Sequence, residues 1–253
     1  MKFPQTTPIK IEKLAETIST NEYLAEQCAH GNVEEFHTVF TEFQTSGKGQ
    51  RGNSWESEAG KNLLFSTVLY PTTLEAKQQF NLSILVTGSI LDALEQFTEG
   101  FSIKWPNDIY WKDKKIAGIL IENILEGKYI SQCIIGIGLN VNQKEFHSSA
   151  PNPVSLAQII GEELNREELL ERILHNIVAG YRAMEKNYPG IQEALRLLYL
   201  LKLYRRHGFY PYQDKQGQFM AEFYQIDSDG HLYLKDEEGN IRKYAFKEVT
   251  YLL

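Results

Sequence analysis

A loop that sets two cations between glycines is the first stretch of this sequence that could do chemistry. It runs QTSGKGQRGNSWES over residues 44–57 and carries Lys48 and Arg51. Because glycine has no Cβ, the backbone of such a loop can approach a ligand closely, and the two cations favour a negatively charged one. Taken alone, the loop is compatible with two interpretations, an anion-binding loop and a solvated surface turn.

The loop does not match the common phosphate-binding motifs. A dinucleotide-binding loop opens a helix, whereas this one runs towards a stretch typical of a strand, NLLFSTVLY at 62–70. A Walker A loop ends in Gly-Lys-Ser/Thr, where this chain has Asn53 and Ser54 after the last glycine. Protein kinases carry H-R-D and D-F-G, and the chain contains neither. The loop therefore indicates a phosphate-gripping or adenylate-forming site of another kind.

Two further clusters have residue types suited to a ligand site. KWPND at 104–108 combines a cation, an aromatic ring, a rigid turn and a carboxylate, and Lys115 follows seven residues after Asp108. The alternative is a hairpin that Trp and Pro merely shape. IIGIGLNVN at 134–142 places Gly136 and Gly138 inside an apolar stretch, where glycine indicates either a close ligand or a tight strand crossing.

Hydrophobic periodicity predicts how these clusters are positioned. Strands are expected over 36–44, 62–70, 101–105, 108–111, 115–122 and 129–141, and helices after 19–21, over 74–97 and within 154–161, 166–187 and 191–203. Strands so close in sequence favour an antiparallel or mixed sheet backed by helices, which is an α+β fold. From His207 on, short strands separated by turn residues predict a small β-barrel. We therefore expect a catalytic domain over 1–204 and a barrel domain over 205–253.

Composition limits the functions that the chain can have. It has 253 residues, 42% of them hydrophobic, and a formal net charge of −7, which argues against non-specific nucleic-acid binding. Its two cysteines, Cys28 and Cys133, have no metal-binding spacing and suit a reduced, cytoplasmic compartment. No secretion signal and no apolar run of membrane-spanning length are present in the sequence. We predict a cytoplasmic protein without a membrane partner.

In chain order, the motifs of this sequence resemble those of the biotin protein ligases. The motifs are Ser19-Thr20-Asn21, GKGQRGNSW, KWPND, KIAGIL and GIGLNVN. The resemblance implies a class II synthetase-like, biotin/lipoate ligase catalytic fold with a C-terminal Src-homology-3-like barrel. It implies that biotin and ATP form biotinyl-5′-AMP with Mg²⁺, and that the biotinyl group passes to one lysine of a biotin carboxyl carrier domain of acetyl-CoA carboxylase or a related carboxylase.

The resemblance also implies roles for individual residues. Lys115 would lie at the biotin carboxylate and the α-phosphate, and Asp108 would accept a proton from, or orient, the acceptor lysine, with Lys48 and Arg51 as further catalytic cations. The ligand-binding residues would be Ser19, Thr20, Asn21, Gln44, Gly47, Lys48, Gly49, Gln50, Arg51, Trp55, Lys104, Asn107, Lys115, Gly118, Gly136 and Asn140. Asn140 and Asp108 are the candidates for the metal. Trp55 would cover the adenine or close the loop, or else be a core aromatic.

The sequence departs from the family pattern in its loop. Gln50 stands where the family often has arginine, and Arg51, one residue later, points elsewhere in an extended loop and compensates only in part. About eighteen residues precede Ser19, too few for a helix-turn-helix domain, so we expect a monofunctional enzyme that does not bind DNA.

Two questions, the exact function and the oligomeric state, stay open from the sequence alone. A lipoate or octanoate ligase or transferase of the same fold and a non-catalytic nucleotide-binding module are the alternative functions, although the R-R-x-S-G-G-G type of motif expected of a lipoate ligase does not occur. A homodimer and a monomer are both compatible with the sequence. The six histidines have no triad-like context, so we expect them to be surface or structural residues.

Overall fold

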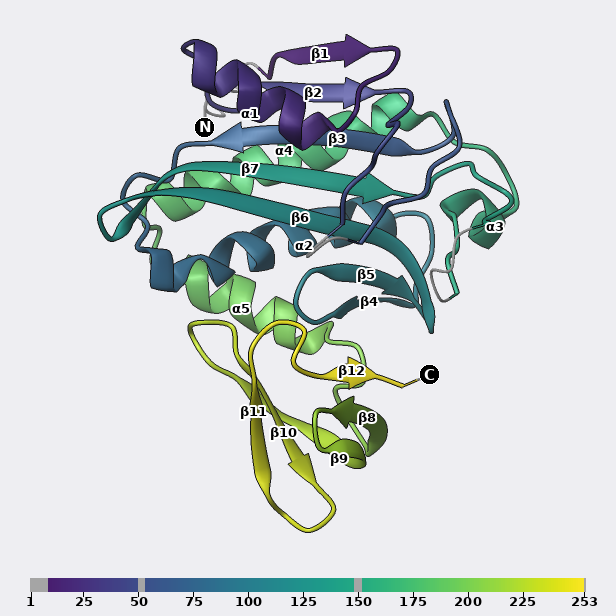
Figure 1. The fold of residues 1–253 in the computed structure, drawn as a ribbon, viewed down its shortest axis with the longest axis vertical. Helices are drawn as coiled ribbons and strands as arrows, with labels where there is room; N and C mark the ends of the chain where they lie inside the picture. Colours follow the sequence, from purple (N-terminus) through teal and green to yellow (C-terminus); the bar gives the residue numbers. More distant parts are fainter. Residues whose placement is uncertain (1–8, 50–52, 148–151, 253) are drawn as a thin grey trace.

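The computed structural model describes residues 9–49, 53–147 and 152–252 and arranges them around two β-sheets (Figure 1). The larger sheet has seven strands in the order β1-β2-β3-β7-β6-β5-β4. Its strands are β1 (Ile11–Leu14), β2 (Thr38–Thr41), β3 (Leu63–Leu69), β4 (Phe101–Lys104), β5 (Asp108–Trp111), β6 (Lys114–Glu126) and β7 (Tyr129–Leu139). β1 and β2 are parallel, whereas the other neighbouring strands are antiparallel. The prediction of a mixed sheet in an α+β fold is confirmed.

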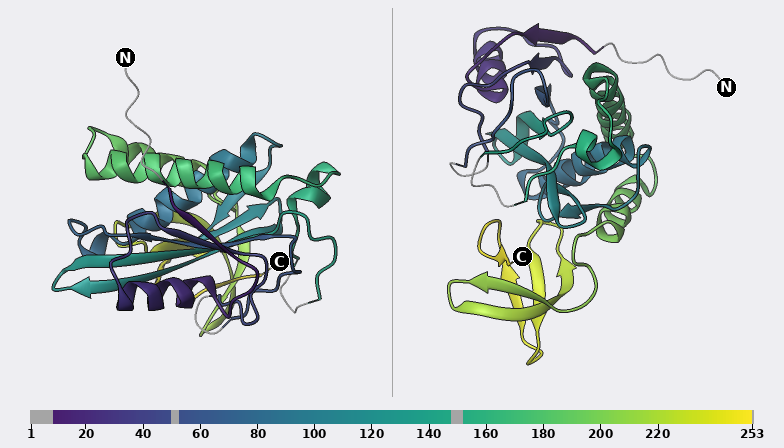
Figure 2. Two further views of the ribbon diagram at one scale, coloured as in Figure 1. Left: turned by 90° about the horizontal axis from the view of Figure 1, so that it is seen from above. Right: turned by 90° about the vertical axis from the view of Figure 1, so that its right-hand side faces the viewer.

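Helices cover both faces of this sheet. They are α1 (Thr20–His30), a 3₁₀ turn (Ala76–Gln78), α2 (Phe80–Glu95), α3 (Leu156–Ile160), α4 (Arg166–Glu185) and α5 (Ile191–Leu201). Figure 2 shows α1 on one face and α2 and α4 on the other. α2 is apolar almost all round because it is enclosed between the sheet and helices α4 and α5. No helix in the described part of the chain is long and apolar enough to cross a membrane.

Some boundaries differ from the predicted ones. The strand expected over 36–44 is only β2, and the chain leaves the sheet before the glycine loop begins. β1 was not predicted at all, because it is four residues long with two charges, Glu12 and Lys13, in its middle. Such charges are tolerated on an edge strand, which has a neighbour on only one side. The helix expected over 74–97 begins with the 3₁₀ turn and becomes α-helical at Phe80.

The C-terminal segment forms the second, five-stranded antiparallel sheet in the order β11-β10-β9-β8-β12. Its strands are β8 (Tyr210–Asp214), β9 (Gly217–Ile226), β10 (Leu232–Asp236), β11 (Ile241–Tyr244) and β12 (Thr250–Tyr251). The predicted β-rich tail is therefore confirmed, while the domain boundary at 204/205 stays a prediction.

The second sheet is fixed to the first at the turn between β4 and β5. The indole Nε1 of Trp105 donates a hydrogen bond to the carbonyl of Gly230 at 2.9 Å. The rings of Phe80 and Trp105 both contact Phe246, with centroids 6.3 and 5.3 Å away. A Cβ on Gly230 would lie 2.7 to 3.0 Å from atoms of Phe80, so the turn between β9 and β10 approaches helix α2 as closely as a glycine permits.

We expect Gly230→Ala to destabilise the protein more than Gly239→Ala. Both glycines have φ of +88°, so both substitutions carry the same backbone cost, but a Cβ on Gly239 meets nothing within 4 Å. The collision with Phe80 should add about 1–3 kcal/mol to the loss of unfolding free energy, the range for overpacking a core. Urea denaturation of the two variants measures the difference. Equal losses would mean that Phe80 moves aside freely.

Candidate active site

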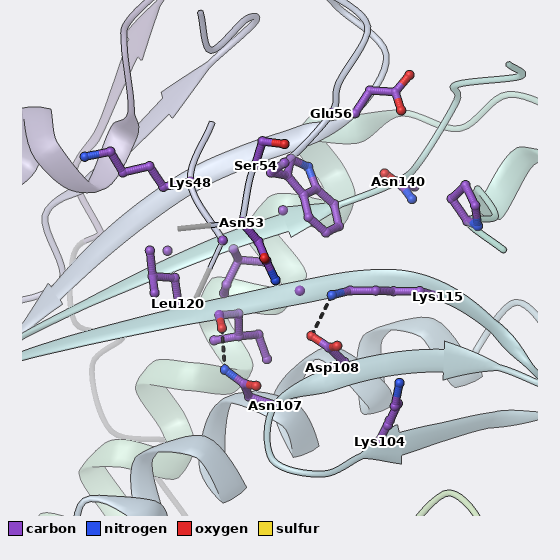
Figure 3. Close-up of a pocket in the computed structure, with 18 of the residues that line it drawn as sticks. Lys48, Asn53, Ser54, Glu56, Lys104, Asn107, Asp108, Lys115, Leu120 and Asn140 are labelled. Carbon is purple, nitrogen blue, oxygen red and sulfur yellow. Dashed lines mark hydrogen bonds and ion pairs between the residues drawn. The ribbon is translucent and has the colours of Figure 1, made fainter. Parts of the chain in front are cut away.

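A cavity of about 860 Å³ opens above the middle of the larger sheet and collects most of the residues singled out in the sequence (Figure 3). The start of α1, the glycine loop, the β4–β5 turn and strands β6 and β7 all contribute to its wall. Every described residue of the predicted site lines this cavity except Gly47. Gln50 and Arg51 lie outside the described residues. Motifs far apart in sequence are thus brought to one place.

Three glycines form the floor of the cavity. Gly118 on β6 lies directly opposite Gly138 on β7, and Gly136 lies opposite Leu120. A Cβ on Gly138 would lie 2.5 Å from the indole of Trp55, and one on Gly118 would lie 2.9 Å from it. A Cβ on Gly136 would overlap the side chain of Asn21. These three strand positions leave no room for a Cβ, because the side chains of Trp55 and Asn21 lie directly on the glycines.

A chain of polar groups occupies the end of the cavity next to α1. The Ser66 hydroxyl donates to Asn21 Oδ1 at 2.6 Å, and its oxygen lies 2.7 Å from Thr20 Oγ1. Asn21 Nδ2 in turn donates to Glu122 Oε2 at 2.7 Å, and the Gln44 amide oxygen accepts from the Thr20 backbone N–H at 2.8 Å. These bonds fix the side chains at the start of the helix, where backbone N–H groups have no partner within the helix. Ser19, the residue before the helix, is also buried here.

The glycine loop folds back on itself beside this polar end. Gly49 N donates to Asn53 O at 2.6 Å, and Trp55 N donates to Gly47 O at 2.8 Å. Gly47 itself lies behind Trp55, where a Cβ would come within 2.7 Å of the Trp55 carbonyl. Lys48 forms an ion pair with Glu22 of α1, and this hydrogen bond raises the pKa of Lys48. The loop thus carries a charged lysine to the rim of the cavity.

An ion pair stands at the opposite end of the floor. Lys115 Nζ lies 2.8 Å from Asp108 Oδ1, and each side chain is 27% exposed. Figure 3 shows the two side chains pointing toward each other from neighbouring strands. Lys115 Nζ also lies 5.6 Å from the ring centroid of Trp55, within cation–π range. The pair is therefore half-open to the cavity and is held between two strands and an indole.

Lys104 is a second lysine near Asp108. It lies at the end of β4, in register with Asp108 on β5. Burial lowers the pKa of Lys104 to about 8, and Lys115 and Arg205 act in the same direction while Asp108 opposes them. Lys104 is thus a poorly hydrated cation inside the cavity.

Asn107 and Asn140, two of the three asparagines of the predicted site, are held differently. Asn107 Nδ2 donates to the carbonyl of Ile119, which fixes the β4–β5 turn against β6. Asn140 Nδ2 donates to Val154 O at 3.2 Å, whereas its buried Oδ1 has no hydrogen-bond partner among the described residues. Asn140 therefore presents a free oxygen.

Several lining residues were not found from the sequence. Asn53, Ser54 and Glu56 lie next to Trp55 in the loop, and their position beside a predicted site residue could have identified them. The others are Tyr110, Ile119, Leu120, Ile137, Phe146, Pro153, Lys247, Val249, Thr250 and Tyr251. The last four come from the C-terminal segment, and no local sequence pattern predicts that this segment reaches the cavity. None of the histidines lines the cavity, and no His/Cys/Asp/Glu cluster suited to a metal ion occurs in the part of the chain that the structure describes.

Comparisons with known proteins agree with this geometry. Residues 14–140 match the model of the biotin/lipoate A/B protein ligase family. The chain is 28% identical to the bifunctional ligase/repressor BirA of Bacillus spizizenii over 91% of its own length and 71% of that protein. It is 26% identical to the biotin–[acetyl-CoA-carboxylase] ligase of Mycobacterium tuberculosis over 67% of its length and 63% of that protein.

A solved structure is similar over nearly the whole fold. The biotin protein ligase of Aquifex aeolicus, in complex with biotin and ATP, superposes with a TM-score of 0.79 and 28% identity, covering 95% of this chain and 97% of that one. The similarity extends through both sheets and agrees with the family match over the cavity-forming strands. The chain belongs to the biotin/lipoate A/B protein ligase family.

Proposed function

We propose that this protein attaches biotin to a lysine of a biotin carboxyl carrier domain in two steps. In the first, a biotin carboxylate oxygen bonds to the α-phosphorus of ATP, and pyrophosphate leaves. In the second, the lysine amine bonds to the acyl carbon of biotinyl-5′-AMP, loses a proton, and AMP leaves. The observation that carries the proposal is the half-open Lys115–Asp108 pair at the edge of a glycine floor. The ligase names of the relatives and the biotin–ATP complex of the similar structure support it.

The chemistry of each end of the cavity suits one part of the reaction. The hydrogen-bonding groups of Ser19, Thr20 and Gln44 suit the ureido ring of biotin, and the backbone of Gly118 and Gly136 suits a close wall of the site. Lys115 suits the point where the carboxylate meets the α-phosphate, because a fixed cation there offsets the repulsion of two anions. Trp55, on the floor beside Lys115, suits a contact with the base or the closure of the loop.

Mg²⁺ fits the residues at the Asn140 end. This ion prefers oxygen ligands and usually keeps waters and substrate phosphates around it, with one or two protein groups. Asn140 Oδ1 is buried and unpaired, whereas Asp108 is already engaged by Lys115. Of the two candidates, Asn140 would therefore hold the ion. When bound with ATP, the ion neutralises phosphate charge.

The alternatives differ from this proposal in a measurable way. Biotin-dependent exchange of pyrophosphate into ATP supports the ligase, dependence on lipoate or octanoyl groups would support the transferase, and nucleotide binding without exchange would support a non-catalytic module. Mass spectrometry of a carrier domain incubated with enzyme, ATP and biotin tests the complete reaction. The repressor function named in the Bacillus relative is not part of the proposal, and a cytoplasmic location and a homodimer stay predictions.

We expect Lys115→Ala to slow adenylate formation by about 100-fold or more. Removing one fixed charge at a reacting centre costs on the order of 3 kcal/mol of barrier. Lys114→Ala is the matched control, because Lys114 is the preceding residue of β6 and is exposed. Single-turnover pyrophosphate release measures the rate, and circular dichroism checks the fold. Release at the wild-type rate in Lys115→Ala would refute the role given to Lys115.

We expect Asp108→Asn to impair mainly the transfer step. Asparagine keeps the size of the side chain but cannot accept a proton from the incoming amine, so biotinyl-5′-AMP should form and then accumulate. The control is Asp229→Asn, an exposed aspartate between β9 and β10. Supplying synthetic biotinyl-5′-AMP and a carrier domain isolates this step. If Asp108→Asn transfers biotin from the adenylate normally, the role given to Asp108 is wrong.

A further inference from the structure

The ammonium group of Lys104 lies between two tyrosine rings that come from different sheets. Its Nζ donates to Tyr110 Oη at 3.0 Å and lies 4.9 Å from the centroid of that ring. On its other side, the ring of Tyr251 has its centroid 5.1 Å from Nζ. Both distances fall within the range of cation–π attraction, about 6 Å. Tyr110 belongs to β5 of the larger sheet, whereas Tyr251 belongs to β12 of the C-terminal sheet.

Tyr251 is held in place by its own sheet. It pairs with Tyr212 of β8, and the two rings pack edge to face with centroids 4.9 Å apart. Arg205 donates to the carbonyls of Leu252 and Pro211 at 2.7 and 3.2 Å, which joins the end of β12 to strand β8. The Tyr251 side chain therefore reaches the cavity from a rigid support.

We propose that Tyr251 is a positioning residue, whose ring holds the Lys104 ammonium in the cavity as a second fixed cation beside Lys115. The C-terminal sheet then completes the side of the site that binds the phosphate groups of ATP. This inference rests on the proposed ligase function, because a second fixed cation is needed only when the ligand carries several phosphate charges.

The physical reason is the weak hydration of Lys104. A buried lysine tends to lose its proton, and a neutral amine cannot stabilise phosphate charge. Asp108 favours the charged form, whereas Lys115 and Arg205 oppose it. The hydroxyl of Tyr110 and the ring of Tyr251 add attraction for the ammonium without bringing in another anion that would repel ATP.

The test measures the titration of Lys104 directly by NMR of protein labelled with ¹³C at the lysine ε-carbons, with the Lys104 signal assigned by its loss in Lys104→Met. In the unsubstituted protein, the ring of Tyr251 should shift the Lys104 ε-protons upfield. Tyr251→Leu keeps an apolar cover but removes the ring, so the pKa of Lys104 should fall by about one unit. Tyr251→Phe restores the ring and should restore the titration midpoint.

The control is Tyr244→Leu, which removes an equally buried tyrosine of the same sheet that does not line the cavity. It should leave the Lys104 midpoint unchanged.

In the exchange assay, Tyr251→Leu should raise the KM for ATP several-fold and leave the KM for biotin nearly constant. An unchanged midpoint in Tyr251→Leu, the same shift in Tyr244→Leu, or Lys104 ε-protons without an upfield shift in the unsubstituted protein would each overturn the inference. The NMR result does not depend on catalysis, so failure of the ligase proposal would be seen separately, as absence of exchange in the unsubstituted protein.

Discussion

The register of strands β3, β7 and β6 is the constraint on which the site depends. It places Gly136 between Ser66 and Leu120, and Gly138 opposite Gly118, so that residues without side chains meet on one face of the sheet. Because successive residues of a strand point to opposite faces, a slip of one position would bring Ile135 or Ile137 onto this face, into the space that Asn21 and Trp55 occupy. The hydrophobic packing that fixes the register therefore also keeps the cavity open.

Local sequence was enough to find the parts of the site that lie on single motifs. Glycines inside a strand, a loop of alternating glycines and cations, and a dense KWPND cluster each have a local physical reason, and their described residues meet in one cavity apart from Gly47. Tyr251 and Lys247 could not be found in this way, because they reach the cavity only through the docking of the second sheet. Strand β1 was not predicted for a different reason, because four residues with two charges in the middle show no strand periodicity.

An acidic chain holds cations in this cavity by several different means. Lys48 pairs with Glu22 at the rim, Lys115 pairs with Asp108 over the floor, and Lys104 lies between two rings. Exposed ion pairs contribute little to the free energy of unfolding, because water screens them. Their effect here is to fix the direction of each ammonium group, and a fixed charge stabilises a transition state better than one that must reorient.

In the proposed reaction, Asp108 must not repel the anionic substrates in the first step and must receive the incoming amine in the second. Its pairing with Lys115 would meet both requirements. While biotin and ATP are both bound, a further carboxylate would add to the repulsion, and the Lys115 ammonium at 2.8 Å offsets it. Once pyrophosphate leaves, much of the negative charge leaves with it. Asp108 can then turn to the incoming amine, which must lose a proton before it can attack, since a free lysine has a pKa of about 10.4. In the proposed reaction, one ion pair on adjacent strands would thus serve both half-reactions without rearrangement of the sheet.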